Sequence, residues 1–593
     1  MRLIGGQKVK KAKAKSRLRK LRRLLAESLE DRNMLAAISW DGGGGDLRWS
    51  NSLNWSSDRL PTASDDVSID AGNEAIEIRS GTHSVRSIDL NSDLQIENAR
   101  LFTEGFAIAP GSTLVVEGAN SEFVANAATA IDGANFVASS NGMLTVGSVT
   151  TVSNTFGDMY WRATGAGSVL SFPDLKTINN GTGRNWDTFL ESFQGGKLDL
   201  GAVTEIIDPN SGDLRQRSVQ VKAEGVGSEV DLSSLQNFVD YAGYATSDSD
   251  GEYSRLHATL GGHIKLSELS IVRGVYFPVD STGTIDLSTI TSLSHGLVEA
   301  GRSVNLSALE SGYSTDFVTS GPDIDLSNLH DADHAVFTID GRDLNLDSVE
   351  SIDGASFYVS GGVSIEIPSV TTVSNTYGDV YWRVTGSGSV LSFPNLTSVN
   401  NGTGRNWDAF LESLQGGKLD LGRVTEIIDP NSGDLRQRSV QVKAEGVGSE
   451  VDLSSLQNFV DYAGYATSDS DGEYSRLHAT QGGLVNLGAL STVRGVYFPV
   501  DALGTIDLST ITSLSHGLVE AGRSVDLSAL ESGYSTDFVT SGPDIDLSNL
   551  RDADHAVFTI DGRDLNLDSV ESIDGASFYV SGGVSIEIPS VTT

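Results

Sequence analysis

A short apolar phrase recurs along most of the chain and sets the expected fold. Its clearest copy is residues 283–293, in which Gly is followed by the pattern x-apolar-x-Leu-Ser-x-apolar-x-x-apolar. Successive copies are 19 to 34 residues apart, and such a period is typical of solenoids, in which each repeat forms one coil. The central apolar position falls at Val146, Phe172, Leu200, Leu232, Leu266, Leu287, Leu306, Leu326, Leu346 and Ile367.

A second phrase precedes the first in each coil and has the alternation of a β-strand. In residues 316–321, 336–341 and 356–361, an aromatic residue lies near the start of a short alternating run that ends on Gly. Alternation with a period of two is typical of strands with one buried face, and Gly permits the tight turn that follows. Two or three short strands in each coil of about 20 residues predict an all-β, right-handed parallel β-helix.

The leucine-rich repeat is the competing fold, because a Leu-Ser-x-Leu phrase also suits it. The Asn or Cys that marks that repeat is missing, and no coil contains a segment long enough for a helix. These two departures favour the β-helix. We therefore expect each copy of the phrase to line the inner wall of one coil and to pack on the copies in neighbouring coils.

A longer repeat of 221 residues contains nine of the short ones. Residues 155–351 and 376–572 differ at 22 of 197 aligned positions, and most of the changes are mild. Because a third copy begins and soon stops, we expect the chain to be part of a longer array. The predicted divisions are irregular coils at 76–130, a first unit at 131–351, a second unit at 352–572 and the start of a third at 573–593.

Charge is distributed unevenly along the chain. Residues 1–37 hold 12 of the 41 Lys and Arg and 3 of the 79 Asp and Glu, so the remainder has 29 basic and 76 acidic residues and a net charge of −47. Such a surface repels nucleic acid and anionic membranes. It favours solubility, and it could also attract divalent cations or cationic partners. The chain has no Cys, and no apolar run reaches the roughly 18–20 residues of a transmembrane helix.

The first 37 residues are predicted to be a processed targeting segment. Residues 8–23 are strongly basic, and Leu18, Leu21, Leu25 and Leu29 follow helical spacing, so we expect one short helix with little to pack on. A basic arm often binds nucleic acid or a membrane surface, but this one precedes an acidic body. It also lacks the apolar core of an ordinary secretion signal.

A short motif closes this segment and suggests where the protein goes. Residues 27–37 read Glu-Ser-Leu-Glu-Asp-Arg-Asn-Met-Leu-Ala-Ala. They resemble a segment near the start of many planctomycete-type exported surface proteins. The resemblance implies export to the cell envelope or exterior, with the mature protein beginning after Ala37.

Residues 38–75 are rich in Trp and Gly and differ from the coils that follow. Trp40, Trp49 and Trp55 are followed by Leu60-Pro61 and by an Asp-Asp-Val run. This series is similar to the module that opens many bacterial surface β-solenoids, including autotransporter-like ones. Because the first coil of a solenoid exposes an apolar end, we expect an N-terminal cap. The alternative is that the Trp rings stack on sugars.

Four of the nine coils in each unit carry long insertions, all placed between the bend of one coil and the aromatic strand of the next. Insertions at one corner of consecutive coils should stack into one ridge, and loops on a rigid scaffold often carry function. The ridge is a candidate surface for a carbohydrate or a protein, and the alternative is that its aromatic residues pin the loops. The candidate residues are Arg184, Trp186, Arg215, Arg217, Tyr241, Tyr244 and Tyr253, with their copies Arg405, Trp407, Arg436, Arg438, Tyr462, Tyr465 and Tyr474.

The longest insertion resembles a partial calcium loop. Alternating carboxylates before a Gly turn suit a hard cation with oxygen ligands. The pattern departs from a calcium loop at its first position, Thr246, and at its twelfth, His257, so a solvated acidic turn is the alternative. Calcium is the one cofactor that the sequence suggests. Its candidate ligands are Asp248, Asp250 and Glu252, with the copies Asp469, Asp471 and Glu473.

Catalysis has little support in the sequence. Polysaccharide cleavage needs clustered carboxylates or a cation with a nearby base, and no paired-Asp or Gly-His-Gly phrase recurs. His263 becomes Leu484 in the second unit, and near-identical duplication suits avidity. We expect a non-catalytic, monomeric structural or adhesive protein of the cell surface or exterior, whose partner is a surface glycan or protein and not nucleic acid. The alternative is a carbohydrate-binding or polysaccharide-cleaving β-helix that uses the ridge.

Overall fold

The computed structural model describes residues 37–243, 253–464 and 474–591. Within these ranges the chain forms strands β1 to β55 and one 3₁₀ turn, η1 (Ser52–Asn54), and no α-helix. Strands pair in parallel from coil to coil, so the predicted parallel β-solenoid is confirmed. The helix predicted near the N-terminus lies outside the described residues, and the right-handed sense of the coil stays a prediction.

Each regular coil contributes one strand to each of three parallel sheets. The coil that begins at Met159 runs through β12 (Met159–Thr164), β13 (Val169–Ser171) and β14 (Thr177–Asn179). The next coil places β15 (Asp187–Phe193), β16 (Lys197–Asp199) and β17 (Glu205–Asp208) beside them in register. We call the sheets that contain β12, β13 and β14 sheet 1, sheet 2 and sheet 3.

Sheet 1 is continuous from β3 (Ile76–Ile78) to β55 (Ser577–Ser581). In the short coils, sheet 2 shrinks to two-residue strands such as β28 (Val304–Asn305), and sheet 3 shrinks to single bridges such as Ser292 with Ser311. The regular strands of sheet 1 are β9 (Asn135–Ser139), β12, β15, β18 (Ser218–Glu224), β21 (Ser254–Thr259), β24 (Val275–Val279), β27 (Leu297–Ala300), β29 (Asp316–Ser320), β31 (Val336–Asp340), β32 (Ser356–Ser360), β35 (Val380–Thr385), β38 (Asp408–Leu414), β41 (Ser439–Glu445), β44 (Ser475–Thr480), β47 (Val496–Val500), β50 (Leu518–Ala521), β52 (Asp537–Ser541), β54 (Val557–Asp561) and β55.

The other two sheets follow the same order. Before the regular array, sheet 2 begins with β1 (Ala37–Ser39), β2 (Asp66–Ile69), β4 (Gly81–Leu90), β6 (Ala99–Ile108) and β8 (Glu122–Ala130), and it continues through β10 (Met143–Val146), β13, β16, β19 (Glu229–Asp231), β22 (His263–Lys265) and β25 (Thr284–Ile285). Sheet 3 of the first unit consists of β11 (Thr151–Ser153), β14, β17, β20 (Asn237–Asp240), β23 (Ile271–Arg273) and β26 (Ser292–Ser294).

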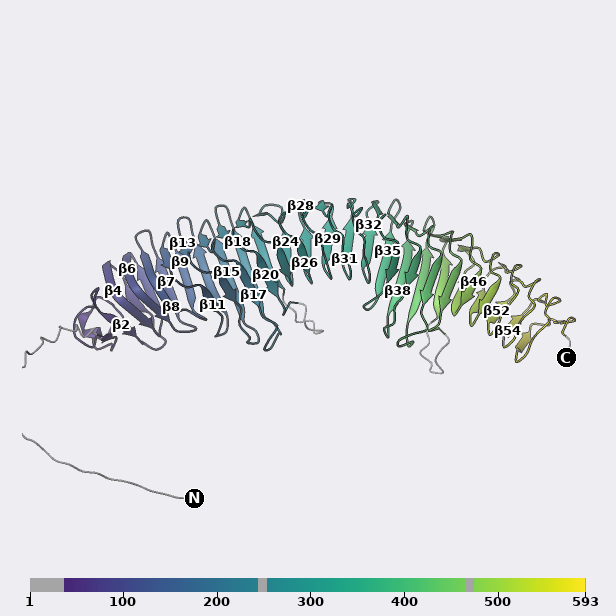
Figure 1. Cartoon of the computed structure of the whole chain (residues 1–593), viewed down its shortest axis with the longest axis horizontal. Helices are drawn as coiled ribbons and strands as arrows, with labels where there is room; N and C mark the ends of the chain where they lie inside the picture. Colours follow the sequence, from purple (N-terminus) through teal and green to yellow (C-terminus); the bar gives the residue numbers. More distant parts are fainter. Residues whose placement is uncertain (1–36, 244–252, 465–473, 592–593) are drawn as a thin grey trace, which may run out of the picture.

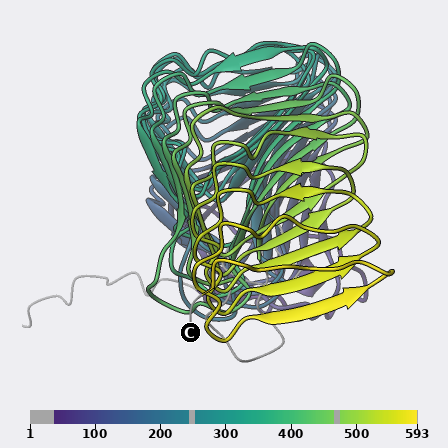
Figure 2. The same ribbon diagram turned by 90° about the vertical axis from the view of Figure 1, so that its right-hand side faces the viewer.

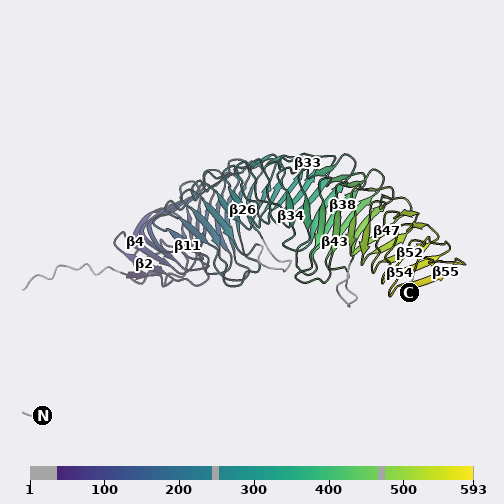
Figure 3. The ribbon, with the colours of Figure 1, turned by 45° about the vertical axis from the view of Figure 1, so that its right-hand side comes forward.

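The stacked coils form a long curved rod, with the short coils around β28 to β32 at the crest of the arc (Figure 1). Longer coils lie on both sides of the crest, as the turned view also shows (Figure 3). Seen from the C-terminal end, the coils lie one behind another (Figure 2). The long coils of the first unit therefore lie on one side of the crest and those of the second unit on the other.

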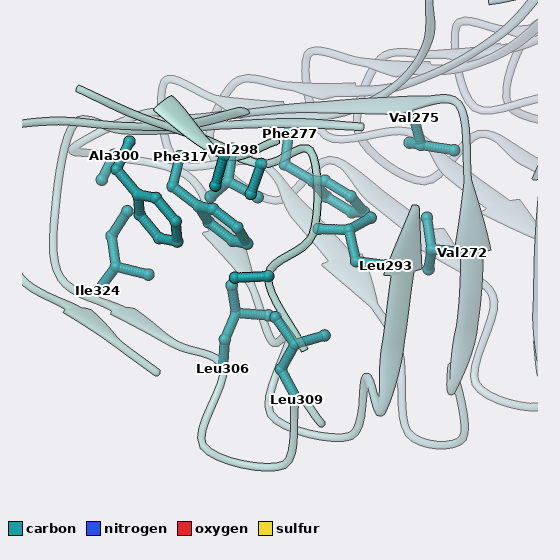
Figure 4. Close-up of a cluster of buried hydrophobic side chains, with 14 of the residues drawn as sticks. Val272, Val275, Phe277, Leu293, Val298, Ala300, Leu306, Leu309, Phe317 and Ile324 are labelled. Carbon is teal, nitrogen blue, oxygen red and sulfur yellow. The ribbon is translucent and has the colours of Figure 1, made fainter. Parts of the chain in front are cut away.

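The recurring phrase lines the inner wall of the coils, as the sequence predicts. Its central residues Leu287, Leu306, Leu326 and Leu346 are at most 2% exposed. Opposite them, inward aromatic residues of sheet 1 stack from coil to coil, and the ring centroids of Phe317 and Phe337 are 5.2 Å apart. Figure 4 shows Phe277 and Phe317 of sheet 1 on one side of this core, with Leu306 and Leu309 on the other.

The three Trp residues near the start of the chain lie inside the fold. Trp49 and Trp55 are completely buried and Trp40 is 8% exposed. Their rings meet edge to face, with centroids 5.1 Å apart for Trp40 and Trp55 and 4.7 Å apart for Trp49 and Trp55. Because a sugar cannot reach a buried indole face, this packing favours the N-terminal cap over sugar stacking.

Replacing Leu326 by Ala should destabilise the fold strongly. The substitution leaves a cavity in a fully packed coil, which costs about 2–5 kcal/mol. Urea unfolding followed by circular dichroism measures the change. Leu260→Ala is the matched control, because Leu260 is 62% exposed, and equal losses in the two variants would contradict the inward placement of the phrase.

Candidate functional site

The long insertions all leave the solenoid at the corner that joins sheet 3 to sheet 1. One follows β11, one follows β14, one follows β17 and one follows β20, and each leads into a strand of sheet 1. The described loops that follow β11, β14 and β17, with their copies in the second unit, project from the concave side of the arc (Figure 1). The predicted position of the insertions at a single edge is therefore what the structure shows.

Trp186 serves the fold of its own loop. Its half-buried ring lies against Gly183, where an added Cβ would come within 2.1 Å of the indole Cε2. Its carbonyl oxygen accepts a hydrogen bond from Asn180 Nδ2 at 2.9 Å. Trp407 has the same contacts with Gly404 and Asn401. The packing favours the loop-pinning alternative for this pair.

Arg217 was expected on the binding ridge, and the structure contradicts this. The side chain is completely buried beneath the loop that follows β17. Its Nε donates to Asp208 Oδ1 at 2.8 Å, and its Nη1 donates to the carbonyl oxygens of Ser211 at 2.9 Å and Asp213 at 3.1 Å. A guanidinium with five donors in a fixed fork can hold several carbonyls at once, so Arg217 organises the loop. Arg438 has the same burial and the same partners in the second unit.

Below these loops lies a row of buried polar residues at the end of sheet 3. Asn180 Nδ2 donates to Asp208 Oδ2 at 2.7 Å, and Asp208 lies in register with Asp240. Burial raises the pKa of Asp208, against the hydrogen bonds from Arg217 and Asn180. Burial and the neighbouring Asp208 carboxylate raise the pKa of Asp240 to about 7. The corner thus holds carboxyl groups in an interior that disfavours their charge.

The other ridge candidates differ in their surroundings. Arg184 is exposed, while Arg215 is paired with Asp213 through Nε at 2.9 Å. Tyr241 lies under Arg273, whose Cζ is 5.1 Å from the ring centroid, and the carbonyl oxygen of Tyr253 accepts a hydrogen bond from Gln220.

In the second unit, the copies of these four residues keep the same settings. Arg405 is exposed, Arg436 is paired with Asp434, Tyr462 lies under Arg494 and the carbonyl oxygen of Tyr474 accepts from Gln441. Tyr244, Tyr465 and all six predicted calcium ligands, Asp248, Asp250, Glu252, Asp469, Asp471 and Glu473, lie outside the described residues.

Two hollows on the outward face of sheet 1 were not predicted. Each spans three neighbouring strands, β15, β18 and β21 in the first unit and β38, β41 and β44 in the second. Their volumes are about 230 and 390 Å³. The first is lined by Asp187, Phe189, Glu191, Ser218, Gln220, Val221, Lys222, Arg255 and His257. The second is lined by Asp408, Phe410, Glu412, Ser439, Gln441, Val442, Lys443, Arg476 and His478, each 221 residues later.

Each hollow interrupts a row of flat side chains that stack on one another along the outward face of sheet 1. We call this row the ladder. Tyr160 and Phe189 stack with centroids 4.7 Å apart and planes inclined by 4°. Next in register comes Gln220, and then Arg255, whose Cζ lies 5.4 Å from the ring centroid of Tyr276. A ring is therefore missing at Gln220.

The second unit has the same interrupted ladder. Tyr381 and Phe410 stack at 4.7 Å, and Gln441 is next in register. Arg476 follows, with its Cζ 5.5 Å from the ring centroid of Tyr497.

Polar groups surround the space at which the ladder lacks a ring. Gln220 Nε2 is held by Ser218 Oγ at 2.8 Å and by the carbonyl oxygen of Tyr253 at 3.1 Å. Glu191 accepts a hydrogen bond from Arg162 Nε at 2.9 Å and is largely buried. Burial, together with Lys222, lowers the pKa of His257, so its imidazole is neutral near pH 7 and offers one donor and one acceptor.

Sequence reasoning missed these hollows because their residues are ordinary outward positions of alternating strands. One signal could have revealed them. Tyr160 and Phe189 place an aromatic residue at the same outward position in successive coils, and the next coil has Gln220 there instead. Recognising it requires the register between coils of unequal length, which only strand pairing fixes.

Comparison with protein-family models, curated proteins and solved structures finds no match to this chain. In the part of the chain that the structure describes, no group of three or more His, Asp or Glu side chains is arranged to hold a metal ion. No helix among those residues is long and apolar enough to cross a membrane.

Replacing Arg217 by Ala should destabilise the long-loop corner. The change leaves Asp208 buried without its cationic partner, and breaking a buried pair in this way costs about 3–5 kcal/mol. Arg217→Lys should restore only part of the loss, because an ammonium cannot bind the same set of carbonyls. Thermal unfolding with hydrogen exchange of the loop checks this, and full recovery in the Lys variant would contradict the role of the guanidinium fork.

Asp240 and Asp461 should each contribute a loss of stability as the pH rises from about 4 to about 7. Burial, with a neighbouring carboxylate, raises the pKa of both to about 7, whereas an Asp in the unfolded chain titrates near 3.9. The folded state therefore retains these protons through a range in which the unfolded state has lost them, and stability decreases across that range.

The measurement is urea unfolding of the wild type and of the Asp240→Asn/Asp461→Asn protein at pH 5 and pH 8. The variant should lose less stability between the two pH values than the wild type. Equal losses would show that these carboxyl groups are ionised in the folded state throughout.

Proposed function

We propose that this protein is a non-catalytic structural and adhesive solenoid that presents the same recognition surface in successive units along a stiff rod. The observation that carries the proposal is the recurrence of one hollow with nine identical lining residues, 221 residues apart. Nine coils separate the two copies, a distance on the order of 43 Å along the axis at about 4.8 Å per coil.

The pattern of change between the units supports this function. Residues 203–259 are identical to residues 424–480, and this stretch contains β18, β21 and their two long loops. Immediately beyond it, His263 and Lys265 become Leu484 and Asn486. A repeated surface with retained chemistry suits binding to a repetitive partner, because the second contact is made at a high effective concentration.

Absence of catalysis is part of the proposal. The carboxylates of the first hollow have assigned partners, since Glu191 accepts from Arg162 and Asp187 accepts from Ser218 Oγ at 2.7 Å. A general acid and base would have to exchange protons with a substrate instead. The proposed partner is a surface glycan or a protein and not nucleic acid, because the net charge of −47 outside residues 1–37 repels polyanions. The chain is proposed to act as a monomeric rod.

The proposed location is the cell envelope or the exterior. The motif at residues 27–37 resembles those of exported surface proteins. The chain also has no Cys, which suits an exported protein because its folding then needs no thiol chemistry.

Calcium in the acidic loops stays a separate proposal. A calcium-dependent rise in the unfolding temperature that is lost in Asp248→Asn/Asp469→Asn would support it.

Adsorption to insoluble polysaccharides tests the function. Purified chain is mixed with cellulose, chitin, xylan and cross-linked pectate, and both bound protein and released reducing ends are measured. Adsorption to at least one of these polymers without release of reducing ends is the expected result. Release of reducing ends would identify an enzyme instead, and failure to adsorb to any of the four would contradict an adhesive role towards glycans.

A further inference from the structure

The ladder on the outward face of sheet 1 has one position that is empty in each unit. Phe189 and Arg255 stand on either side of Gln220 in register, so they are two strand spacings apart, roughly 9.6 Å. Phe189 is stacked on Tyr160 through one face and turns its other face to the hollow. Arg255 is stacked on Tyr276, and its guanidinium closes the opposite side.

The side chain of Gln220, which stands in register between Phe189 and Arg255, is held away from the space between them. Gln220 Nε2 is bonded to Ser218 Oγ and to the carbonyl oxygen of Tyr253, which holds the amide towards the start of the strand. Gln441 is held by Ser439 and Tyr474 in the same way. The space left between two flat side chains therefore has the dimensions of one ring-shaped ligand.

The charges of the hollow favour a neutral ligand that is rich in hydroxyl groups. The carboxylate acceptors Asp187 and Glu191 lie on β15, and the donor groups of Lys222, Arg255 and His257 lie on β18 and β21. A hydroxyl group both donates and accepts, so adjacent hydroxyls can satisfy carboxylates and cations together through charge-assisted hydrogen bonds. An anionic ligand would approach Asp187 and Glu191 and would also meet the strongly acidic surface of the whole protein.

We propose that each hollow binds one pyranose ring of a neutral polysaccharide, stacked between Phe189 and Arg255 in the first unit and between Phe410 and Arg476 in the second. The slightly positive C–H face of the sugar packs on the negative face of the Phe ring. Its hydroxyls bind the carboxylates of β15 and the cationic groups of β18 and β21. The proposal rests on the adhesive function above and names its ligand and its site, which differs from the long-loop ridge.

Two pairs of variants test the site in the full chain. Gln220→Phe/Gln441→Phe places a ring in each empty position and should block binding while the fold is retained, because the new ring completes the ladder. Phe189→Ala/Phe410→Ala removes the stacking face and should weaken binding at least tenfold. Tyr313→Ala/Tyr534→Ala is the matched control, since these aromatic residues are each 39% exposed and lie outside the hollows.

The probes are cello-, chito-, xylo- and mannohexaose, with hexagalacturonate as the acidic comparison, and calorimetry is the measurement. Wild-type chain should bind at least one neutral hexasaccharide at two sites, with an affinity that changes less than twofold between 50 and 500 mM salt. The control variant should bind equally well. Unfolding temperatures verify that each variant is folded.

Three results would overturn the proposal. They are no binding of any neutral hexasaccharide by wild-type chain, preferential binding of hexagalacturonate, and binding that persists unchanged in the ring-filling variant. The adsorption assay distinguishes a failure of the proposed binding site from a failure of the proposed adhesive function. If the ring-filling variant still adsorbs to a polysaccharide as the wild type does, adhesion stands and the hollows are not its site. If wild-type chain binds hexasaccharides but adsorbs to none of the polymers, the site stands and the adhesive function does not.

Discussion

Parallel, in-register stacking of the coils is the constraint on which the rest of this structure depends. Each backbone N–H and C=O of a strand pairs with the coil on either side, so every side chain is fixed above its counterpart in the previous coil. One apolar residue per coil at the same position therefore forms a continuous inner wall, and in three consecutive short coils Phe317, Phe337 and Phe357 form a stacked row. The same constraint confines long insertions to a corner, because a longer strand segment within a sheet would break the register.

Long insertions at one corner are unfavourable for backbone hydrogen bonding, and buried side chains at that corner compensate for this. Loops of unequal length leave backbone groups near the end of sheet 3 that no neighbouring coil can pair. The buried side chains of Asn180, Arg217 and Asp240 bind such backbone groups instead. Asp208 in turn accepts hydrogen bonds from Asn180 and Arg217 and so holds these two side chains in place. Buried carboxyl groups are tolerated here because each accepts several hydrogen bonds, yet burial still raises their pKa. The residues that look most suited to ligand binding in this ridge are thus largely occupied by the fold.

The outward face of sheet 1 follows the same stacking rule with a different consequence. Side chains at equivalent outward positions form rows along the rod, and a row of flat side chains forms the stacked ladder. Where one coil supplies Gln220 in place of a ring, the ladder opens into a hollow with an aromatic wall, a guanidinium wall and hydrogen-bonding groups of both kinds. Duplication of the unit then produces a second hollow with the same residues.

The sequence by itself determined the parallel β-solenoid, the inward face of the recurring phrase, the 221-residue repeat and the single corner for the insertions. These follow from periodicity, which local alternation and burial dictate for every coil, as Leu326 and Phe337 show. Tertiary structure alone decided that Arg217 is buried beneath its loop and that Trp186 packs on Gly183, because both depend on how a loop folds back on itself. It also decided that Phe189, Gln220 and Arg255 share one site, although they are spread over 67 residues. Coils of unequal length hide the register between them, and only the hydrogen-bonded pairing of the strands restores it.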